Sequence, residues 1–442
     1  MKTFRLGGIH PAESKLTADI EIKDIPTPPE FRIMLSQCIG APSKAIVKQG
    51  DKVSVGDMIA EAGGFVSAPL HSPVNGTVTK LETTRTPQGL WQDCITIKPD
   101  EENPYTSEFK SRTQDEVEAL SSKEIISIVG DAGIVGLGGA TFPTRVKLNV
   151  PEGKKAEYIL INGAECEPYL TCDDRLMREQ PEGILTGALL IRKATDAKKV
   201  IIGIEENKPE AIKAMKKAVK EQNAGNIAQV EVLKKKYPQG SEKQLIYALT
   251  RRIVPTAALP IETGCIVDNV ATAYAVYEAV YKGKPLVERI MTVTGHGIPT
   301  IGNYRVKIGT PINFIIDYCG GISEDISDLK IIAGGPMMGR AVSDIDSYST
   351  KGLSGLLFLE GKETIRKEML PCIRCSKCIS VCPMGLEPYL FMQQAMVQQW
   401  DMMSSHGVMN CLECGSCSYA CPSSRPLLDM IKLGKQELRK RK

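Results

Sequence analysis

Eight of the fourteen cysteines in this chain of 442 residues lie between positions 372 and 421, in two runs of identical spacing. Each run reads Cys-x2-Cys-x2-Cys-x3-Cys-Pro, so a tightly turning loop can direct three sulfurs into one cavity while a fourth comes from farther away. A cubane cluster needs four thiolates around one body, and the pattern therefore predicts two [4Fe-4S] clusters. The predicted ligands are Cys372, Cys375, Cys378, Cys382, Cys411, Cys414, Cys417 and Cys421.

The last cysteine of each run is expected to bind the cluster of the other run, as in two-cluster ferredoxins. The two predicted ligand sets are Cys372, Cys375, Cys378 and Cys421, and Cys411, Cys414, Cys417 and Cys382. Paired Cys-x2-Cys motifs can also form a tetrahedral zinc site, but two runs of four cysteines followed by proline exceed what zinc needs. Segment 387–400, between the runs, has the apolar spacing of a helix and favours an α-helical ferredoxin-like module.

Composition and charge limit the remaining possibilities. With 42% hydrophobic and 24% charged residues the chain has the composition of a globular protein, and its length requires several domains. The formal net charge of +3 gives no reason to expect a nucleic-acid partner. No secretory apolar stretch follows the first residues and no apolar run is long enough to span a membrane, so we expect no transmembrane segment in this chain.

The middle of the chain, from about residue 122 to 281, alternates between β-rich and helical patterns. Segments 158–162 and 200–204 have the composition of short strands, whereas 209–221 carries apolar residues at helical spacing. This alternation predicts an α/β domain with a mostly parallel sheet.

A glycine-rich loop at 136–143 precedes the first of these strands. Its glycines let backbone amides approach a phosphate. Lys147 follows the loop, and Glu165 and Glu167 come just after the strand at 158–162, where ligands of open α/β folds bind. Together these features indicate a nucleotide site.

Four segments of this region resemble, in the same order, the FMN-binding, NADH-oxidising subunit of respiratory complex I. They are 136–147, 162–168, 237–242 and 268–272. Three further segments narrow the resemblance to the C subunits of Rnf complexes, the membrane ferredoxin:NAD oxidoreductases, and extend it over nearly the whole chain. These are Gly7-Gly8-Ile9-His10-Pro11, Gly40-Ala41-Pro42 and 71–76.

The resemblance implies roles for individual residues. The FMN site that it implies consists of Gly136, Gly138, Gly139, Lys147, Asn162, Asn269 and Thr272, with Tyr237, Gly240 and Glu165 beside them. Phe142 matches an aromatic residue that stacks on the nucleotide, and Glu167 and Glu242 match the catalytic residues that contact NADH. Glycine amides and a lysine supply positive potential, while asparagine amides and a threonine hydroxyl can bind ribityl or phosphate oxygens. The positions that depart from the relatives include Ala164, Ser241 and Val150.

By the same resemblance, the chain would be a peripheral subunit on the cytoplasmic side of a cell-membrane complex that couples ferredoxin and NAD to the pumping of sodium or protons. NAD(H) would exchange a hydride with FMN, and single electrons would pass through the two clusters to or from other subunits. Ferredoxin would be reached only through another subunit.

Two alternatives remain open. The first is a flavin and iron–sulfur cobalamin reductase of propanediol microcompartments, which shares the glycine loop and the cluster runs. The second is a flavin-free electron-relay or docking subunit, which the departures at Ala164 and Ser241 would permit.

The predicted fold class is a multidomain α/β protein with small β domains and an α-helical ferredoxin module. The expected parts are an N-terminal extension at 1–30, a lipoyl-like barrel-sandwich at 31–100, a Rossmann-like FMN/NADH domain at 110–285, a β-grasp (soluble-ligand-binding) domain with a connector at 286–345, and the ferredoxin-like module at 362–442.

Three local motifs refine this division. Asn75-Gly76 predicts a hairpin within the barrel-sandwich. Gly63-Gly64-Phe65 stands where a working lipoyl-type carrier needs a lysine, so this part is expected to be structural or to serve in docking. Gly334-Gly335-Pro336 is expected to be a turn-rich connector.

Overall fold

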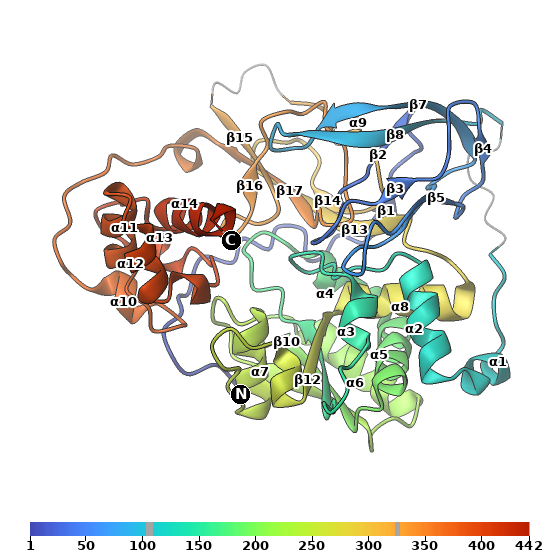
Figure 1. Cartoon of the computed structure of the whole chain (residues 1–442), viewed down its shortest axis with the longest axis horizontal. Coiled ribbons are helices and arrows are strands. Elements are labelled where there is room, and N and C mark those ends of the chain that lie inside the picture. Colours follow the sequence, from blue (N-terminus) through green and yellow to red (C-terminus); the bar gives the residue numbers. More distant parts are fainter. Residues whose placement is uncertain (103–108, 323–327, 442) are drawn as a thin grey trace.

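Four packed parts make up the chain in the computed structural model, which describes residues 1–102, 109–322 and 328–441 (Figure 1). A parallel sheet with its helices and a helical module near the C-terminus lie beside two parts built mainly from antiparallel strands. Residues 323–327, within the expected β-grasp domain, and residue 442, in the expected ferredoxin-like module, lie outside the described residues.

A four-stranded parallel sheet forms the centre of the α/β part. Its strands are β9 (Tyr158–Gly163), β10 (Lys199–Glu205), β11 (Ala228–Leu233) and β12 (Cys265–Asn269). The order across the sheet is β11-β10-β9-β12, and every neighbouring pair is parallel. The strands expected at 158–162 and 200–204 and the parallel sheet are therefore confirmed.

Helices cover both faces of this sheet. Ile159 and Ile161 pack on one face, whereas Leu160 between them packs on the other, as the alternation of a strand requires. The helices are α1 (Gln114–Ala119), α2 (Ser122–Asp131), α3 (Thr144–Leu148), α4 (Cys172–Glu179), α5 (Pro181–Thr195), α6 (Pro209–Glu221), α7 (Glu242–Thr250) and α8 (Val270–Lys282), with a 3-10 turn η1 (Pro260–Thr263). The helix expected at 209–221 is confirmed as α6.

The barrel-sandwich part consists of two small antiparallel sheets around one apolar core. Its strands are β2 (Phe31–Met34), β3 (Lys44–Ala45), β4 (Lys52–Val53), β5 (Met58–Glu61), β6 (Leu70–His71), β7 (Gly76–Arg85) and β8 (Trp91–Pro99). The order is β2-β8-β7-β4 in one sheet and β3-β5-β6 in the other. Phe31, Ile59 and Val78 are among the fully buried side chains between them.

The hairpin expected at Asn75-Gly76 is wrong. Gly76 begins β7 and pairs with Val53 and Pro99, so the chain passes here from one sheet to the other. A Cβ atom on Gly76 would collide with the carbonyl oxygen of Lys98. The glycine is needed for this close approach of two backbones, and the same dipeptide therefore mimics a turn signal.

The segment that follows the α/β part forms most of a six-stranded mixed sheet, which β1 (Ile22–Asp24) joins from near the N-terminus. The other elements of this part are β13 (Glu288–Gly295), β14 (Gly302–Lys307), α9 (Ile312–Tyr318), β15 (Leu329–Ala333), β16 (Arg340–Ala341) and β17 (Gly355–Glu360), with a 3-10 turn η2 (Gly361–Glu363). The strand order is β1-β14-β13-β17-β15-β16. The glycine-rich connector is the loop of the hairpin formed by β15 and β16, and we call residues 334–339 the hairpin loop.

Short helices form the last part around a small apolar core that includes Phe391, Trp400 and Met403. They are α10 (Lys377–Ser380), α11 (Pro388–Met396), α12 (Trp400–Ser405), η3 (Val408–Asn410), α13 (Ser416–Ala420) and α14 (Leu427–Lys440). The helix expected between the cysteine runs is confirmed as α11, although a second helix starts at Trp400.

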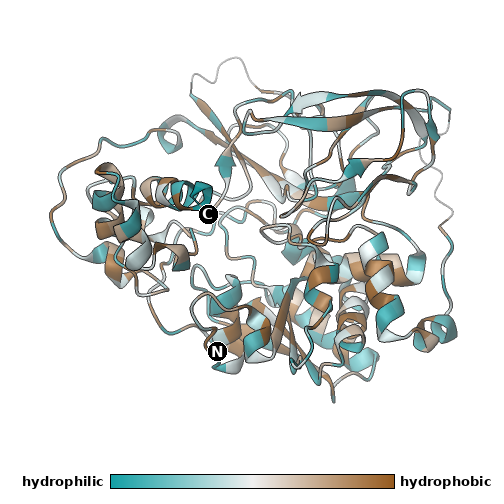
Figure 2. Cartoon of the chain, in the orientation of Figure 1, coloured by the Kyte–Doolittle hydropathy of each residue, from teal (hydrophilic) through white to brown (hydrophobic). Residues whose placement is uncertain are grey.

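The hydropathy of the helices follows their packing. Figure 2 shows the strands of the parallel sheet mostly in brown and the final turns of α14 in teal. Leu427, Ile431 and Leu438 form the buried face of α14, whereas its last turn carries Arg439 and Lys440. Across the described ranges, 1–102, 109–322 and 328–441, no helix has both the length and the apolar character needed to cross a membrane.

The N-terminal segment, residues 1–20, runs across parts that lie far from it in sequence. Lys2 forms a parallel bridge at the end of β11, and Ile9 pairs with Tyr237. Lys15 is half-buried, and its Nζ donates hydrogen bonds to three backbone carbonyl oxygens in the loop that follows β9. The segment therefore fixes the carboxyl edge of the parallel sheet before the chain enters the barrel-sandwich.

Two buried cations join the α/β part to its neighbours. Lys351 Nζ donates to the carbonyl oxygens of Pro69 (2.8 Å) and Gly133 (2.7 Å). Arg289 donates to the carbonyl oxygens of Lys351 (2.6 Å) and Leu137 (3.3 Å), which links the glycine-rich loop to the six-stranded sheet. Burial lowers the pKa of Lys351 to about 7.

The contact between α5 and α8 yields a stability prediction. A Cβ atom on Gly187 would collide with the carbonyl oxygen of Ala273, and neither helix backbone can yield easily. Gly187→Ala should lower the free energy of unfolding of the α/β part by at least about 1–3 kcal/mol. Urea unfolding followed by circular dichroism checks this, with Gly225→Ala, at an open position, as the matched control. Equal urea midpoints for the two variants would contradict the close contact of α5 with α8 at Gly187.

Candidate flavin and iron–sulfur sites

The strand order changes direction at β9, because β10 and β11 lie on one side of it and β12 on the other. Such a switch point leaves a crevice at the carboxyl ends of the two strands that diverge. Asn162 and Asn269 stand opposite each other there, at the ends of β9 and β12, and Asn269 Nδ2 lies 3.4 Å from the carbonyl oxygen of Asn162. We call this place the crevice.

The glycine-rich loop lies over the crevice and the first turn of α8. Leu137 N donates to Thr272 Oγ1 at 2.9 Å, and a Cβ atom on Gly138 would lie 2.6 Å from Asn269 Nδ2. A Cβ atom on Gly139 would meet no protein atom within 4 Å. The loop thus combines free glycine backbone with the amino end of a thirteen-residue helix, which is the chemistry that holds a phosphate.

Lys147 places a positive charge at the same edge. It lies on α3, and its Nζ donates to the carbonyl oxygen of Val267 at 2.7 Å. Its Nζ also lies 3.6 Å from Asp268 Oδ1 and 3.7 Å from Glu242 Oε1. Burial raises the pKa of Asp268, whose carboxylate oxygens have no hydrogen-bond donor among the described residues. Glu242, at the start of α7, keeps 43% of its side chain exposed beside this lysine.

The loop before α7 closes the crevice from a third side. Asn162 Nδ2 donates to the carbonyl oxygen of Gly240 at 2.8 Å. The structure therefore brings together most of the residues expected around FMN. They are Gly136, Gly138, Gly139, Lys147, Asn162, Gly240, Asn269 and Thr272, with Glu242 beside them and the half-buried Phe142 in the same loop. These residues fit a phosphorylated flavin, because they offer backbone amides, one cation and side-chain amides around glycines without side chains.

Glu165, Glu167 and Tyr237 are engaged elsewhere. The Glu165 carboxylate accepts hydrogen bonds from the backbone amides of Asp173 (2.7 Å) and Asp174 (3.3 Å) at the start of α4. Glu167 accepts from backbone amides of the hairpin loop. Tyr237 OH lies 3.3 Å from Glu167 Oε1 and 2.8 Å from the carbonyl oxygen of Cys414. Glu167 and Tyr237 therefore lie between the crevice and the helical module, whereas Glu165 lies against the start of α4.

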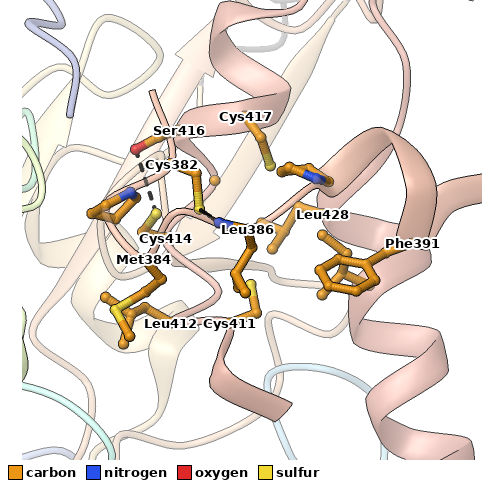
Figure 3. Close-up of a pocket in the computed structure, with 14 residues that line it drawn as sticks. Cys382, Met384, Leu386, Phe391, Cys411, Leu412, Cys414, Ser416, Cys417 and Leu428 are labelled. Atoms are coloured by element: carbon orange, nitrogen blue, oxygen red, sulfur yellow. Dashed lines mark hydrogen bonds between the residues drawn. The ribbon is translucent and has the colours of Figure 1, made fainter. Parts of the chain in front are cut away.

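One of the two predicted cysteine sets lines a single pocket (Figure 3). Cys382 comes from the first run, and Cys411, Cys414 and Cys417 come from the second. Leu386, Phe391 and Leu428 are among the apolar residues that complete the lining. This is the crossed arrangement that the spacing predicts, with the last cysteine of one run beside the first three of the other.

Burial raises the pKa of three of these thiols: that of Cys411 to about 11, that of Cys417 to about 12, and that of Cys414 above its ordinary value. At neutral pH these three free thiols are therefore protonated, and iron binding must displace their protons. Backbone amides already point at two of the sulfurs, because Leu386 N lies 3.3 Å from Cys382 Sγ and Glu413 N lies 3.4 Å from Cys411 Sγ. Such donors stabilise a thiolate.

The other cysteine set lies nearer to the surface. Cys378 and Cys421 are half-buried and pack against the apolar residues Met392 and Leu427. Cys372 and Cys375 are exposed. The pocket of Figure 3 is thus the more enclosed of the two sites.

The distances also bear on zinc. Sulfurs around a tetrahedral zinc ion lie about 4 Å apart, given a Zn–S bond of about 2.3 Å. Across the described ranges, the one group of three or more metal-ligating side chains with ligand atoms within 4.8 Å of one another is Glu165, Cys172 and Asp173. Among the described residues, no three cysteine sulfurs of the pocket come within that spacing of one another, so the pocket does not have the arrangement of a single tetrahedral ion.

Two participants were not found from the sequence. Lys15 and the hairpin loop both reach the segment after β9, and neither has a motif that shows its partner. The motif Gly7-Gly8-Ile9-His10-Pro11 indicated only the family resemblance and predicted no contact. In the structure, a Cβ atom on Gly8 would crowd Lys236 and Phe4.

The cluster assignment predicts iron content. Cys378→Ala and Cys417→Ala should each lose about one cluster, or about four of eight irons, because each removes a ligand from a different set. Iron determination on anaerobically purified protein measures this. Cys265→Ala, at a buried cysteine outside both runs, is the control and should keep all iron. Unchanged iron in both ligand variants would refute the assignment.

The crevice predicts a flavin effect at a glycine with room around it. Gly139→Ala should leave the melting temperature of the flavin-free chain unchanged, because no protein atom lies within 4 Å of the added Cβ. It should weaken FMN binding about tenfold or more, because a methyl group keeps a phosphate from the backbone amides and each 1.4 kcal/mol is tenfold. Flavin titration by fluorescence measures this, with Gly225→Ala as the control. Equal affinities of the two variants for FMN would contradict the assignment of the phosphate site to this loop.

Models of known families match the four parts of the chain in order. They are an RnfC barrel sandwich hybrid domain over residues 2–102, a Nuo51 FMN-binding domain over 129–278, an SLBB domain over 290–341 and a 4Fe-4S dicluster domain over 364–422. The FMN-binding match spans the crevice, and the dicluster match spans both cysteine runs.

A solved structure shows the same fold at low sequence identity. An NAD+-reducing [NiFe]-hydrogenase matches with a TM-score of 0.50 and 17% identity, over 73% of this chain and 62% of that chain.

Curated relatives cover most of the chain. The C subunit of the ion-translocating oxidoreductase complex of Rhodobacter capsulatus is 43% identical over 87% of this chain and 73% of the relative. The C subunit of the proton-translocating ferredoxin:NAD(+) oxidoreductase complex of Clostridium ljungdahlii is 42% identical over 88% and 83%. The Na(+)-translocating counterpart of Acetobacterium woodii is 41% identical over 99% and 97%. The chain belongs to the RnfC family, the C subunits of ion-translocating ferredoxin:NAD oxidoreductase complexes.

Proposed function

We propose that this chain is the NADH-, FMN- and iron–sulfur-binding subunit of a membrane ion-translocating ferredoxin:NAD+ oxidoreductase complex. It is a peripheral subunit on the cytoplasmic side, its partners are the other subunits, and ferredoxin reaches it through one of them. One observation carries the proposal: this chain contains both a crevice with the chemistry of a flavin phosphate site and an enclosed pocket of four cysteines. The two parts that hold them are in contact, because Tyr237 OH lies 2.8 Å from the carbonyl oxygen of Cys414.

FMN, when bound, supplies the conversion between two-electron and one-electron transfer: it exchanges a hydride with NAD(H) and single electrons with the clusters. The residues of the crevice hold and orient it. The amides of the glycine-rich loop and the amino end of α8 bind the phosphate, and Asn162 and Asn269 bind polar groups of the cofactor. Glu242 keeps an exposed carboxylate beside Lys147, where it can contact the dinucleotide.

The position of the cysteine sets indicates the order of the clusters. The set around Cys382 and Cys414 lies against the α/β part, since Gln244 Nε2 also donates to the carbonyl oxygen of Pro383 at 3.2 Å. The set that contains Cys372 and Cys375 lies at the surface. Electrons therefore enter or leave the chain at the set that contains Cys372 and Cys375. They exchange with the flavin through the set around Cys382 and Cys414.

The finer description of the parts belongs to the same proposal. We assign two [4Fe-4S] clusters to the helical module, a Rossmann-like topology to the FMN/NADH part at 110–285, a lipoyl-like topology to the barrel-sandwich at 31–100 and a β-grasp to the part at 286–345. The all-parallel sheet with helices on both faces, the paired antiparallel sheets and the mixed sheet with α9 support these assignments.

The proposal predicts the outcome of an anaerobic assay on the purified chain. One FMN and about eight irons per chain are expected, and NADH should bleach the flavin and then the cluster absorbance, because both sites lie in one polypeptide. Lys147→Met, which removes the cation of the crevice, should lower FMN content and leave the iron unchanged. Eight irons without flavin, or a flavin that NADH does not bleach, would instead favour the relay subunit or the cobalamin-reductase alternative.

A further inference from the structure

Six separate stretches of the chain meet in one small apolar cluster, which we call the junction. It lies between the α/β part and the helical module. Its members are Ile9 of the N-terminal segment, Cys166 and Tyr237 of the α/β part, Met337 of the hairpin loop, and Val381 and Cys414 of the helical module.

The hairpin loop enters the junction through its backbone. Met337 N and Met338 N donate to the two carboxylate oxygens of Glu167, at 3.0 and 2.9 Å. A Cβ atom on Gly335 would collide with this carboxylate, so the glycine is required for the approach. Hydrogen bonds from backbone amides to a carboxylate are about twice as strong as those between neutral groups.

The opposite side of the loop faces the iron–sulfur pocket. A Cβ atom on Gly415 would lie 2.9 Å from the carbonyl oxygen of Met337, and Gly415 has a positive φ of 75°. Gly415 follows Cys414 and lines the pocket with it. The hairpin loop therefore lies between Glu167 of the α/β part and the predicted cluster ligand Cys414 of the helical module.

The two methionines at the tip differ in environment. The side chain of Met337 packs in the junction, whereas Met338 is 47% exposed. A hairpin tip without a role would turn both side chains to solvent, since loops run over the surface. Here one of them joins an apolar cluster that holds a ligand cysteine.

We propose that the hairpin loop is a positioning element that fixes the separation of the crevice from the cluster held by Cys382, Cys411, Cys414 and Cys417. Met337 packs against the cluster side, and Glu167 anchors the loop to the flavin side. Glu167 therefore acts through the loop, because both of its oxygens accept amide hydrogen bonds. This inference rests on the proposed function and deepens it.

The adjacent methionines provide a matched test in the full chain loaded with FMN and iron. Met337→Ala should leave FMN content, iron content and the rate of flavin bleaching by NADH unchanged. It should slow the following reduction of the clusters severalfold, because the rate of electron transfer falls steeply as the flavin and the cluster move apart. Met338→Ala should match the wild type in every step, and stopped-flow absorbance resolves the two phases.

A second readout does not depend on electron transfer. Hydrogen–deuterium exchange should show slow exchange in peptides covering 334–339 of the wild-type chain, because carboxylate and packing protect these amides. Met337→Ala and Gly335→Ala should both raise the exchange of this loop and of the segment around Cys414. Met338→Ala should not.

The outcomes separate this inference from the proposed function. A wild-type chain without FMN, or one whose flavin NADH does not bleach, would refute the proposed function. A normal wild type together with normal cluster reduction and exchange in Met337→Ala would refute only the inference. A raised KM for NADH in Met337→Ala with unchanged cluster reduction would instead place the loop in the nucleotide pocket, and loss of iron in that variant would make Met337 a structural support of the pocket; either result overturns the proposal.

Discussion

The parallel pairing of β9 with β12 is the constraint on which the rest of the structure depends. Because β12 returns to the free side of β9, the two strands end with Asn162 opposite Asn269, and α8 begins directly at this edge. The glycine-rich loop, Lys147 and the start of α7 then find their places by contact with this edge. A shift of one residue in this register would turn the buried side chains of β12 to the wrong face.

Buried and half-buried cations hold the parts around this edge. Lys15, Arg289 and Lys351 each donate to backbone carbonyl oxygens that belong to distant stretches of the chain. A buried cation is costly unless its donors are satisfied, so each contact specifies one arrangement of the parts rather than adding general cohesion. These contacts join the flavin crevice to the barrel-sandwich and the six-stranded sheet, whereas the iron–sulfur pocket meets the α/β part through Tyr237 and Gln244.

The sequence predicted what depends on local spacing. The cysteine runs, the β-rich composition of β9 and β10 and the helix at 209–221 were all readable from neighbouring residues. It failed at Asn75-Gly76, where a glycine serves a close crossing of strands and looks like a turn. It also could not show that Glu167 faces the hairpin loop, because that contact joins residues 170 positions apart and backbone amides carry no sequence signal.

The crossed cysteines have a consequence for biogenesis. The pocket of Figure 3 needs Cys382 and Cys417, which leave the ribosome in that order with 34 residues between them. At a translation rate of about 5–20 residues per second, Cys382 is exposed for a few seconds before the other three ligands of its set have been synthesised. Since each set borrows a cysteine from the other run, neither inorganic core can be completed on a nascent chain that stops before position 417, and maturation must follow synthesis of both cysteine runs.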